Sequence, residues 1–234
     1  MITKPVMLIT GTRKGIGRYL AEYYSNRQFQ VVGCSRSNID FELDHYKHHN
    51  VSVCDEKNVK AMFKDIRRQY GRLDVLINNA GANYALNPLV MVPYESALKT
   101  IETNLLGTFL MSREAIKIMI NRSIGRIINF SSMAVKHEVK GEAIYTASKS
   151  AIISMTRVLA KEVYGNGITC NVIAPAAIDT DLMKNIEKKA LNDVLKRNAI
   201  HELGKNEDVS SVIDKLIDIE NNSITGQTIY LGGV

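Results

Sequence analysis

The chain has 234 residues, 45% of them hydrophobic and 23% charged, a balance typical of one globular domain with a substantial core. Its 30 basic and 24 acidic residues give a formal charge of +6. This charge favours phosphorylated or acidic ligands, but the basic residues are scattered, so nucleic-acid binding is not expected. No apolar stretch reaches about 18 residues and the N-terminal one is too short for a signal peptide, which predicts a cytoplasmic protein without membrane contact.

Strand and helix signals alternate from the start of the chain. Residues 6–9 are a short apolar run typical of a buried parallel strand, and they lead into a turn that contains Gly11, Gly15 and Gly17. A helix is predicted from about Ile16. A strand, a glycine-rich turn and a helix in this order are typical of a dinucleotide site, because the glycines let the backbone approach the phosphates and the helix directs its first amides at them.

The second predicted strand, residues 30–34, ends at Ser35 and Arg36. An acidic residue at this place would hold the 2′-hydroxyl of an NAD(H) ribose, whereas an arginine accommodates the 2′-phosphate of NADP(H). The sequence has no acid here, and Arg13 and Lys14 lie in the glycine-rich turn. It therefore predicts NADP(H) as the cofactor. The alternative is that Arg36 is an ordinary surface charge.

The segments that follow are less regular. Residues 37–49 leave room for little more than one or two helical turns. A third strand is predicted at residues 51–55, where Asp55 is a good N-cap for a helix over residues 57–70. A fourth strand and its exit follow at residues 75–81.

No metal site is predicted. His48 and His49 are adjacent, and neighbours on an extended strand point to opposite faces, so we interpret them as structural. Cys34, Cys54 and Cys170 show no Cys-x-x-Cys spacing, and each lies in or at the end of a predicted strand. We expect them to be buried thiols in a reducing compartment.

The second half of the chain continues the alternation. Residues 82–93 form a loop with two prolines that we expect near the substrate opening, and residues 94–121 form a long helix. The remaining elements are strands at residues 126–130, 169–174 and 225–234 and a helix at residues 206–219. Without repeats or linkers, the pattern predicts one α/β domain over residues 1–234. This domain is a doubly wound sheet of seven mostly parallel strands with helices on both faces.

Tyr145 and Lys149 are four residues apart on a helix predicted from Ile144 onward, so they lie on one face. A phenol has a pKa near ~10, and its use as a base near neutrality requires about 4 kcal/mol of phenolate stabilisation, which an ammonium has the right sign to supply. Ser132, 13 residues upstream of Tyr145, adds a hydroxyl that can donate to a substrate oxygen. The three residues together predict proton transfer at a carbonyl or carbinol.

The ordered motifs of the chain resemble the short-chain dehydrogenase/reductase family, and among its members the 3-oxoacyl-[acyl-carrier-protein] reductases. The resemblance runs from Pro5 to Gly233. It rests on residues 10–17, residues 78–81, Asn104, Ser132, the pair Tyr145 and Lys149, and residues 175–180. It implies a Rossmann-type, NADP(H)-dependent oxidoreductase.

The resemblance implies four catalytic residues, Asn104, Ser132, Tyr145 and Lys149. Tyr145 would transfer the proton and Ser132 would hold the substrate oxygen. Lys149 would lower the pKa of Tyr145 and bind the nicotinamide ribose, while the backbone carbonyl of Asn104 would hold a water that relays protons to it. Ser131 is the rival of Ser132, and the family spacing selects Ser132.

The cofactor contacts that the resemblance implies come from the whole length of the chain. They are Gly11, Arg13, Lys14, Gly15, Ile16, Gly17, Arg36, Ser52, Val53, Asn79, Ala80, Gly81, Tyr145, Lys149, Pro175, Ile178 and Thr180. Three positions depart from the family pattern: Ser52 and Gly232 stand where the family often has Asp, and Ala176 stands where it has Gly. We expect the adenine to be held more weakly by Ser52 and the backbone around Val53.

The implied reaction is hydride transfer between NADP(H) and a carbonyl or secondary alcohol. Reduction of a 3-oxoacyl thioester suits a basic protein that meets an acidic carrier protein. A sugar- or polyol-type alcohol is the enzymatic alternative, and a catalytically silent NADP(H)-binding module is the alternative of another class. Residues 133–143, in which His137 is a second candidate acid, and residues 182–196 are expected around the substrate. The family resemblance also implies a homo-oligomer, in the form of a tetramer.

Overall fold

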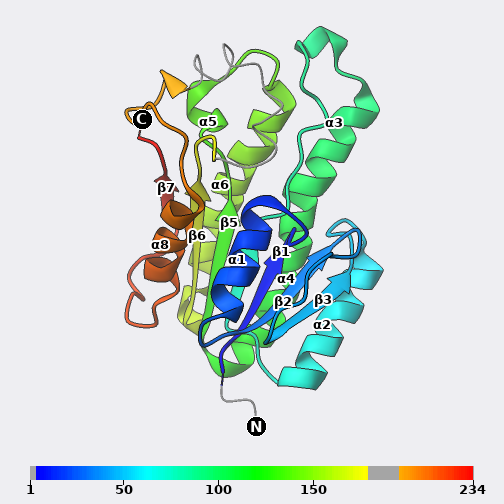
Figure 1. Cartoon of the computed structure of the whole chain (residues 1–234), viewed down its shortest axis with the longest axis vertical. Coiled ribbons are helices and arrows are strands. Elements are labelled where there is room, and N and C mark those ends of the chain that lie inside the picture. Colours follow the sequence, from blue (N-terminus) through cyan, green and yellow to red (C-terminus); the bar gives the residue numbers. More distant parts are fainter. Residues whose placement is uncertain (1–3, 179–194, 234) are drawn as a thin grey trace.

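The computed structural model describes residues 4–178 and 195–233 (Figure 1). Seven described strands form one sheet in the order β3-β2-β1-β4-β5-β6-β7, and every neighbouring pair is parallel. The strands are β1 (Val6–Thr10), β2 (Gln30–Ser35), β3 (Tyr46–Asn50), β4 (Val75–Asn78), β5 (Gly125–Phe130), β6 (Ile168–Ala174) and β7 (Thr228–Tyr230). The doubly wound parallel sheet that the alternating signals predict is confirmed.

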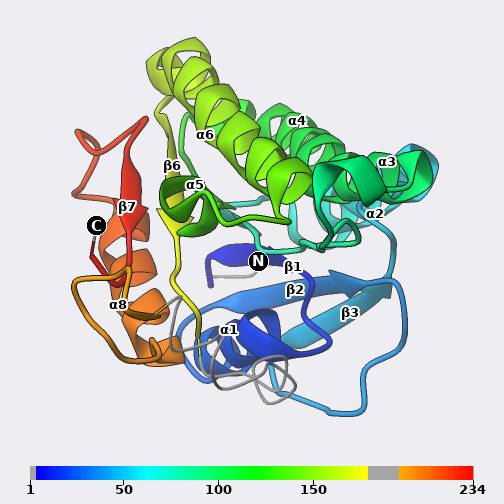
Figure 2. The ribbon, with the colours of Figure 1, turned by 90° about the horizontal axis from the view of Figure 1, so that it is seen from above.

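Helices cover both faces of the sheet. Those within the described residues are α1 (Gly15–Ser25), α2 (Glu56–Tyr70), α3 (Tyr94–Ile101), α4 (Gly107–Met119), α5 (Ala134–His137), α6 (Ala143–Val163) and α8 (Asn206–Ile217). Figure 2 shows α2, α4 and α6 on one side of the sheet and α1 and α8 on the other. None of these helices combines the length and the hydropathy needed to cross a bilayer.

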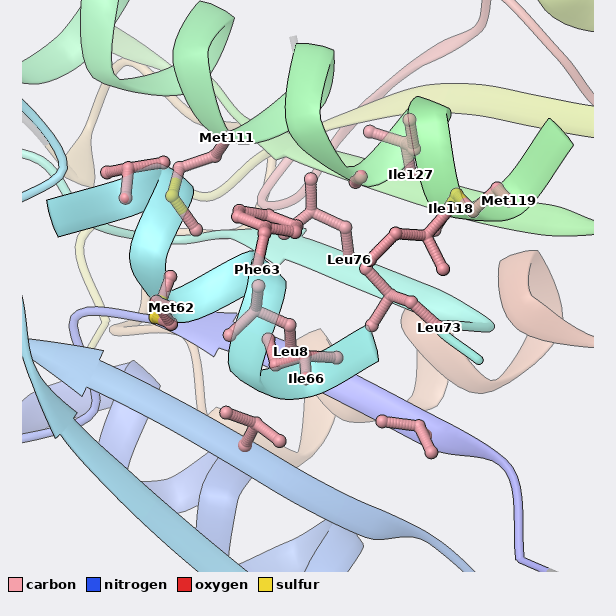
Figure 3. Close-up of a cluster of buried hydrophobic side chains, with 14 of the residues drawn as sticks. Leu8, Met62, Phe63, Ile66, Leu73, Leu76, Met111, Ile118, Met119 and Ile127 are labelled. Carbon is pink, nitrogen blue, oxygen red and sulfur yellow. The ribbon is translucent and has the colours of Figure 1, made fainter. Parts of the chain in front are cut away.

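The side chains of β1 show how the two faces are filled. Val6 and Leu8 point into a core that they share with α2, α4 and α6, part of which is drawn in Figure 3, whereas Met7 and Ile9 point into a second core against α1 and α8. All four side chains are fully buried, and burial of a side chain of this size stabilises the fold by about 1.5–3 kcal/mol. Burial on both faces explains why the central strands appear in the sequence as continuous apolar runs.

The third strand lies earlier in the chain than the sequence predicts. Residues 46–50 form β3, which pairs only with β2 among the described strands, and residues 51–55 are the turn that leads into α2. The sequence Tyr-Lys-His-His-Asn is half-exposed at the edge of the sheet, so it lacks the apolar run that marks a buried strand. No helical turn forms between β2 and β3 either.

The N-cap of α2 is as predicted. The Asp55 carboxylate accepts a hydrogen bond of 3.0 Å from the backbone amide of Asn58, which satisfies one of the amides that the first helical turn leaves free. The helix ends at Gly71 in the left-handed conformation, with φ of 68°.

The cysteines and histidines fall partly where the sequence places them. Cys34 and Cys170 are buried as expected, but Cys54 is exposed because it lies in the turn after β3 and not in a strand. His48 and His49 do lie on a strand, where His48 bonds to Tyr46 and Ser35. Within residues 4–178 and 195–233 no three His, Cys, Asp or Glu side chains converge to hold a metal ion.

The long helix predicted over residues 94–121 is interrupted in the middle. Between α3 and α4 the chain makes a π-helical turn, Glu102–Leu106, and after α4 a 3-10 turn, Ile120–Arg122. A π-helical turn is a frequent companion of functional sites. Here it contains Asn104, whose side chain is fully buried although a mid-helix asparagine is usually exposed.

A buried polar ladder ties the sheet to the helices on one face. Asn78 on β4 donates to Asn129 on β5 at 2.8 Å and to Ser112 on α4 at 3.0 Å. Asn129 in turn donates to Thr156 on α6 at 2.9 Å. Bonds between buried polar groups fix relative position, because breaking one leaves an unsatisfied group in the core. The ladder therefore sets α4 and α6 against the strands that carry the site.

Candidate active site

The carboxyl ends of the central strands border a cavity of about 830 Å³. The expected cofactor residues that line it are Gly11, Arg13, Lys14, Gly15, Ile16, Arg36, Ser52, Val53, Asn79, Ala80 and Gly81. They belong to four separate segments of the chain, which the parallel topology brings to one edge of the sheet. This edge is where open α/β sheets bind their ligands.

The glycine-rich turn between β1 and α1 depends on its glycines for two reasons. Gly11 and Gly15 have φ angles of 76° and 59°, in the region that side chains other than glycine rarely adopt. Gly17 is buried, and a β-carbon there would overlap the carbonyl of Gly11. Gly17 therefore does not line the cavity but allows α1 to pack directly against the turn.

The exit of β4 holds this turn in place. The side-chain amide of Asn79 donates to the carbonyl of Thr10 at 2.9 Å, and the hydroxyl of Thr10 accepts from the amide of Ala80 at 2.8 Å. Asn79 is thus a support of the glycine-rich turn as well as part of the cavity wall.

The cavity is positively charged. Arg13, Lys14, Arg36 and Lys99 line it, against a single carboxylate, Glu102, among the described residues. The N-terminus of α1 adds the partial positive charge of a helix start, and its N-cap residue makes no side-chain cap bond. Such a field attracts the phosphates of a dinucleotide.

Ser131 and Ser132 follow β5 but have different roles. The hydroxyl of Ser131 is buried and donates to the backbone carbonyl of Lys149 at 3.0 Å, which fixes β5 to α6. The hydroxyl of Ser132 accepts from the amide of Ala134 at 3.2 Å and is close enough to Tyr145 to lower its pKa. The geometry therefore favours Ser132 over Ser131 as the residue that faces a substrate.

The ammonium group of Lys149 is buried and hydrogen-bonded to the backbone. The side chain is buried, and Nζ donates to the carbonyl of Phe130 at the end of β5 at 2.9 Å. Nζ is 5.9 Å from the centre of the Tyr145 ring. Burial lowers the pKa of Lys149 to about 8, because a low-dielectric environment disfavours the charged form.

Burial and two neighbouring groups act on the pKa of Tyr145. Burial raises it above the ordinary value of a phenol, and the charge of Glu142 raises it further, whereas Ser132 lowers it. The lowering of this pKa by Lys149, which the resemblance implies, stays a prediction.

Asn104 joins the π-helical turn to the exit of β4. Its side chain accepts from the amide of Ala82 at 2.8 Å and donates to the carbonyl of Ala82 at 2.9 Å and to Ser148 on α6 at 2.9 Å. The backbone carbonyl, which the resemblance assigns to a water relay, accepts from the hydroxyl of Thr108 at 2.7 Å.

Gly81 lies between the cavity and two of the expected catalytic residues. A β-carbon at this position would lie 3.1 Å from Nζ of Lys149 and 3.4 Å from Oδ1 of Asn104. Gly81 also lines the cavity. A ligand in the cavity thus reaches Lys149 past a residue without a side chain.

The remaining expected residues lie at the end of β6. The carbonyl of Pro175 accepts from the amide of Met133 at 3.0 Å, which ties β6 to the segment after Ser132. Ile178 is buried in the core against α1 and α8, so its side chain is a packing group and only its backbone can contact a ligand. Thr180 and residues 182–194 lie outside the described residues.

His137, the second candidate acid, is engaged elsewhere. Its ring bonds to Oδ1 of Asn198 at 2.8 Å, and its carbonyl accepts from Arg197 at 3.1 Å. The sequence reasoning also missed residues that line the cavity, among them Tyr84, Lys99 and Thr103. They come from a loop and from the helix that follows it, and no sequence motif marks them.

A family model described as short chain dehydrogenase matches residues 5–191. The chain therefore belongs to the short-chain dehydrogenase family, as its fold and the order of its motifs predict. Its relatives include the 3-oxoacyl-[acyl-carrier-protein] reductases FabG of Vibrio cholerae, 31% identical, and of Thermotoga maritima, 33% identical. Both alignments cover 97% of this chain and 96% of the relative.

Two solved structures show the same fold. A structure of ElxO with NADP bound has a TM-score of 0.91 and 29% sequence identity, and the match covers 98% of this chain and 97% of that one. A structure of a single-residue variant of the actinorhodin polyketide ketoreductase with NADPH has a TM-score of 0.89 at 24% identity, covering 100% and 97% of the two chains.

Proposed function

We propose that the protein is an NADP(H)-dependent oxidoreductase that interconverts a carbonyl and a secondary alcohol. The observation that carries this proposal is that Ser132 lies next to Tyr145 and Tyr145 near Lys149, whose ammonium adjoins Gly81 in the wall of the positively charged cavity. The cofactor supplies or accepts the hydride. Every other step is assigned to side chains of this chain.

In the reductive direction, the hydroxyl of Ser132 donates to the carbonyl oxygen, and Tyr145 gives that oxygen its proton as the hydride arrives at carbon. A raised pKa keeps Tyr145 protonated and therefore able to act as the acid. Lys149 would hold the nicotinamide ribose, and Asn104 fixes the backbone of Ala82. The reaction leaves Tyr145 as a phenolate, and the relay that the backbone carbonyl of Asn104 supports would return a proton to it through Lys149.

NADP(H) is favoured over NAD(H) by the charges of the cavity. Arg36 stands at the end of β2, where an acid would select the 2′-hydroxyl, and Arg13 and Lys14 line the same cavity. The solved structure of ElxO, which shares the fold, carries NADP. A cytoplasmic location, where such a cofactor is available, fits the free thiols Cys34 and Cys170.

For the substrate, we favour a 3-oxoacyl thioester on an acidic carrier protein. The FabG relatives are reductases of this substrate class by name, and the +6 charge suits an acidic partner. A sugar- or polyol-type alcohol stays the alternative, because Lys140 and Glu142 give the loop before Tyr145 a hydrophilic character.

We also propose a homo-oligomer, with a tetramer as the specific form. Apolar side chains are exposed on the outer surface of the α3–α4 and α6 layer: Leu98, Leu106, Phe109 and Val158. Large exposed apolar side chains are common at protein interfaces.

The test follows NADPH consumption with acetoacetyl-carrier protein, acetoacetyl thioester, a generic diketone and, with NADP⁺, a panel of polyols and sugars. The proposal expects kcat/KM to be highest for the carrier-bound substrate and to fall steeply as salt increases, because long-range attraction is screened. A higher kcat/KM for a sugar or polyol than for the carrier-bound substrate would refute only the assignment of a carrier-bound substrate. Cofactor binding without turnover on any substrate would indicate the silent module.

A further inference from the structure

We propose that Tyr84 is a positioning residue of the 2′-phosphate site, and that through Arg36 it contributes to the choice of NADP(H) over NAD(H). The two residues are 48 positions apart in the sequence, yet both line the cavity, and Nη1 of Arg36 donates to the Tyr84 hydroxyl at 2.8 Å. This inference rests on the proposed use of NADP(H).

The bond matters because Arg36 is otherwise exposed at the end of β2. A long guanidinium side chain on a surface loses conformational freedom when it binds a ligand, and that loss weakens binding. A contact that already holds the guanidinium at the cavity reduces the loss. Arg36 has five N–H donors, and the bond to Tyr84 uses one of them, so the guanidinium keeps donors that can meet a phosphate.

Tyr84 can hold Arg36 because its own backbone is fixed. Its amide donates at 3.3 Å to the hydroxyl of Thr100, which is fully buried on α3. Two residues earlier, Ala82 is held on both sides by Asn104. The phenol therefore extends from a rigid base on one side of the cavity to an arginine on the other.

The same segment continues toward the catalytic helix. The amide of Asn87 donates to the carbonyl of Gly141 at 3.0 Å, four residues before Tyr145. A 2′-phosphate bound by Arg36 would thus be linked through Tyr84 to a segment that also contacts the chain entering α6. Residues 82–87 therefore connect the partner of Arg36 to the chain that enters α6.

The experiment measures binding of adenosine 2′,5′-bisphosphate and of 5′-AMP by titration calorimetry, so that no turnover is involved. The proteins are the full-length wild type, Tyr84→Phe, Arg36→Ala and the double variant. Tyr164→Phe, which removes a hydroxyl from an exposed tyrosine outside the cavity, is the matched control. Thermal unfolding of each variant verifies that it is folded.

Tyr84→Phe is expected to weaken the bisphosphate by about fivefold, the value of one net hydrogen bond, and to leave 5′-AMP unchanged. In the Arg36→Ala background, Tyr84→Phe should cause no further loss of affinity for the bisphosphate, since Tyr84 acts through Arg36.

An equal loss for both nucleotides, no loss for either, or a loss that persists without Arg36 would each overturn the inference. The wild type separates this failure from that of the cofactor assignment. If it binds the bisphosphate more tightly than 5′-AMP while Tyr84→Phe behaves as the wild type does, only the role of Tyr84 is refuted. If it does not distinguish the two nucleotides, the 2′-phosphate site and the role of Tyr84 fail together.

Discussion

At the scale of single residues, burial and nearby charges together set the pKa values of the groups around the hydroxyl of Tyr145. Burial raises the pKa of Tyr145 and lowers that of Lys149 to about 8, so both groups are displaced toward their neutral forms. Perturbed groups of this kind cluster at catalytic sites. Glu142, three residues before Tyr145, adds a negative charge whose own pKa is raised by burial.

Tyr145→Phe should abolish nearly all turnover and leave cofactor binding intact, because it deletes only the hydroxyl that transfers the proton. A positioned acid or base contributes about 10²–10⁴-fold. Steady-state kinetics together with NADPH fluorescence titration would check this. A variant that retained most of its activity would place the acid elsewhere, and His137 would be the first residue to replace.

Glu142→Gln should move the pH profile of alcohol oxidation toward lower pH. Oxidation needs the phenolate of Tyr145, so kcat/KM rises as pH passes the pKa of that group. The Glu142 charge raises this pKa, and its removal therefore lowers it. Glu138→Gln, an exposed change in the same loop, is the control. If the rise of kcat/KM with pH stayed in place in Glu142→Gln, or moved to higher pH, this would argue against the coupling of Glu142 to Tyr145.

At the scale of elements, the site is held by contacts between the end of one element and the middle of another. The π-helical turn between α3 and α4 directs Asn104 inward to the exit of β4, and β5 is attached to α6 by both Ser131 and Lys149. These contacts fix the geometry before any ligand arrives, which is the basis of preorganised catalysis.

Asn104→Ala should therefore affect both stability and function. It removes two bonds to the backbone of Ala82 and one to Ser148, all in a buried place. Unsatisfied buried groups of this kind cost about 2–4 kcal/mol in total. Urea unfolding measures the loss, and Asn121→Ala, which removes one exposed bond at the end of the same helical stretch, should cost far less. Equal stability of the two variants would contradict the role of Asn104 in joining the π-helical turn to the exit of β4.

Most of the strands and helices can be predicted from the sequence, and those that cannot differ for physical reasons. Central strands such as β1 and β6 are buried on both faces, so their apolar runs mark them to within one or two residues. The edge strand β3 has no such run, and the sequence therefore does not locate it. The π-helical turn leaves no apolar run either, and the bond that Asn104 makes from it to Ala82 joins residues 22 positions apart. The pair of Arg36 and Tyr84 leaves no sequence signal, because its two residues are also far apart in the chain.

At the scale of the whole molecule, the distribution of exposed apolar residues bears on assembly. The candidate site is argued from residues of one chain. The exposed side chains of the α3–α4 and α6 layer require another explanation, and contact with a second copy provides one.

Phe109→Asp should shift the protein toward smaller assemblies. Phe109 is 43% exposed on α4, and a buried unpaired carboxylate in an interface is costly. Light scattering at micromolar concentration should show a multiple of 26.1 kDa for the wild type and a reduced mass for the variant. Val90→Asp, at a more exposed site in the loop before α3, is the control. A wild type of one chain mass would refute the assembly altogether.

The polar character of β3 limits how any assembly can grow. A sheet edge with unpaired backbone groups invites another strand, and proteins discourage this with lysine and other polar side chains. On β3, Lys47 is drawn to Asp65 at 2.6 Å and to Gln69 at 2.7 Å, and no residue of the strand is fully buried. This end of the sheet is thus protected against extension, so copies that associate through sheet edges are confined to the opposite end. Association limited in this way closes into a finite particle and does not propagate as a fibre.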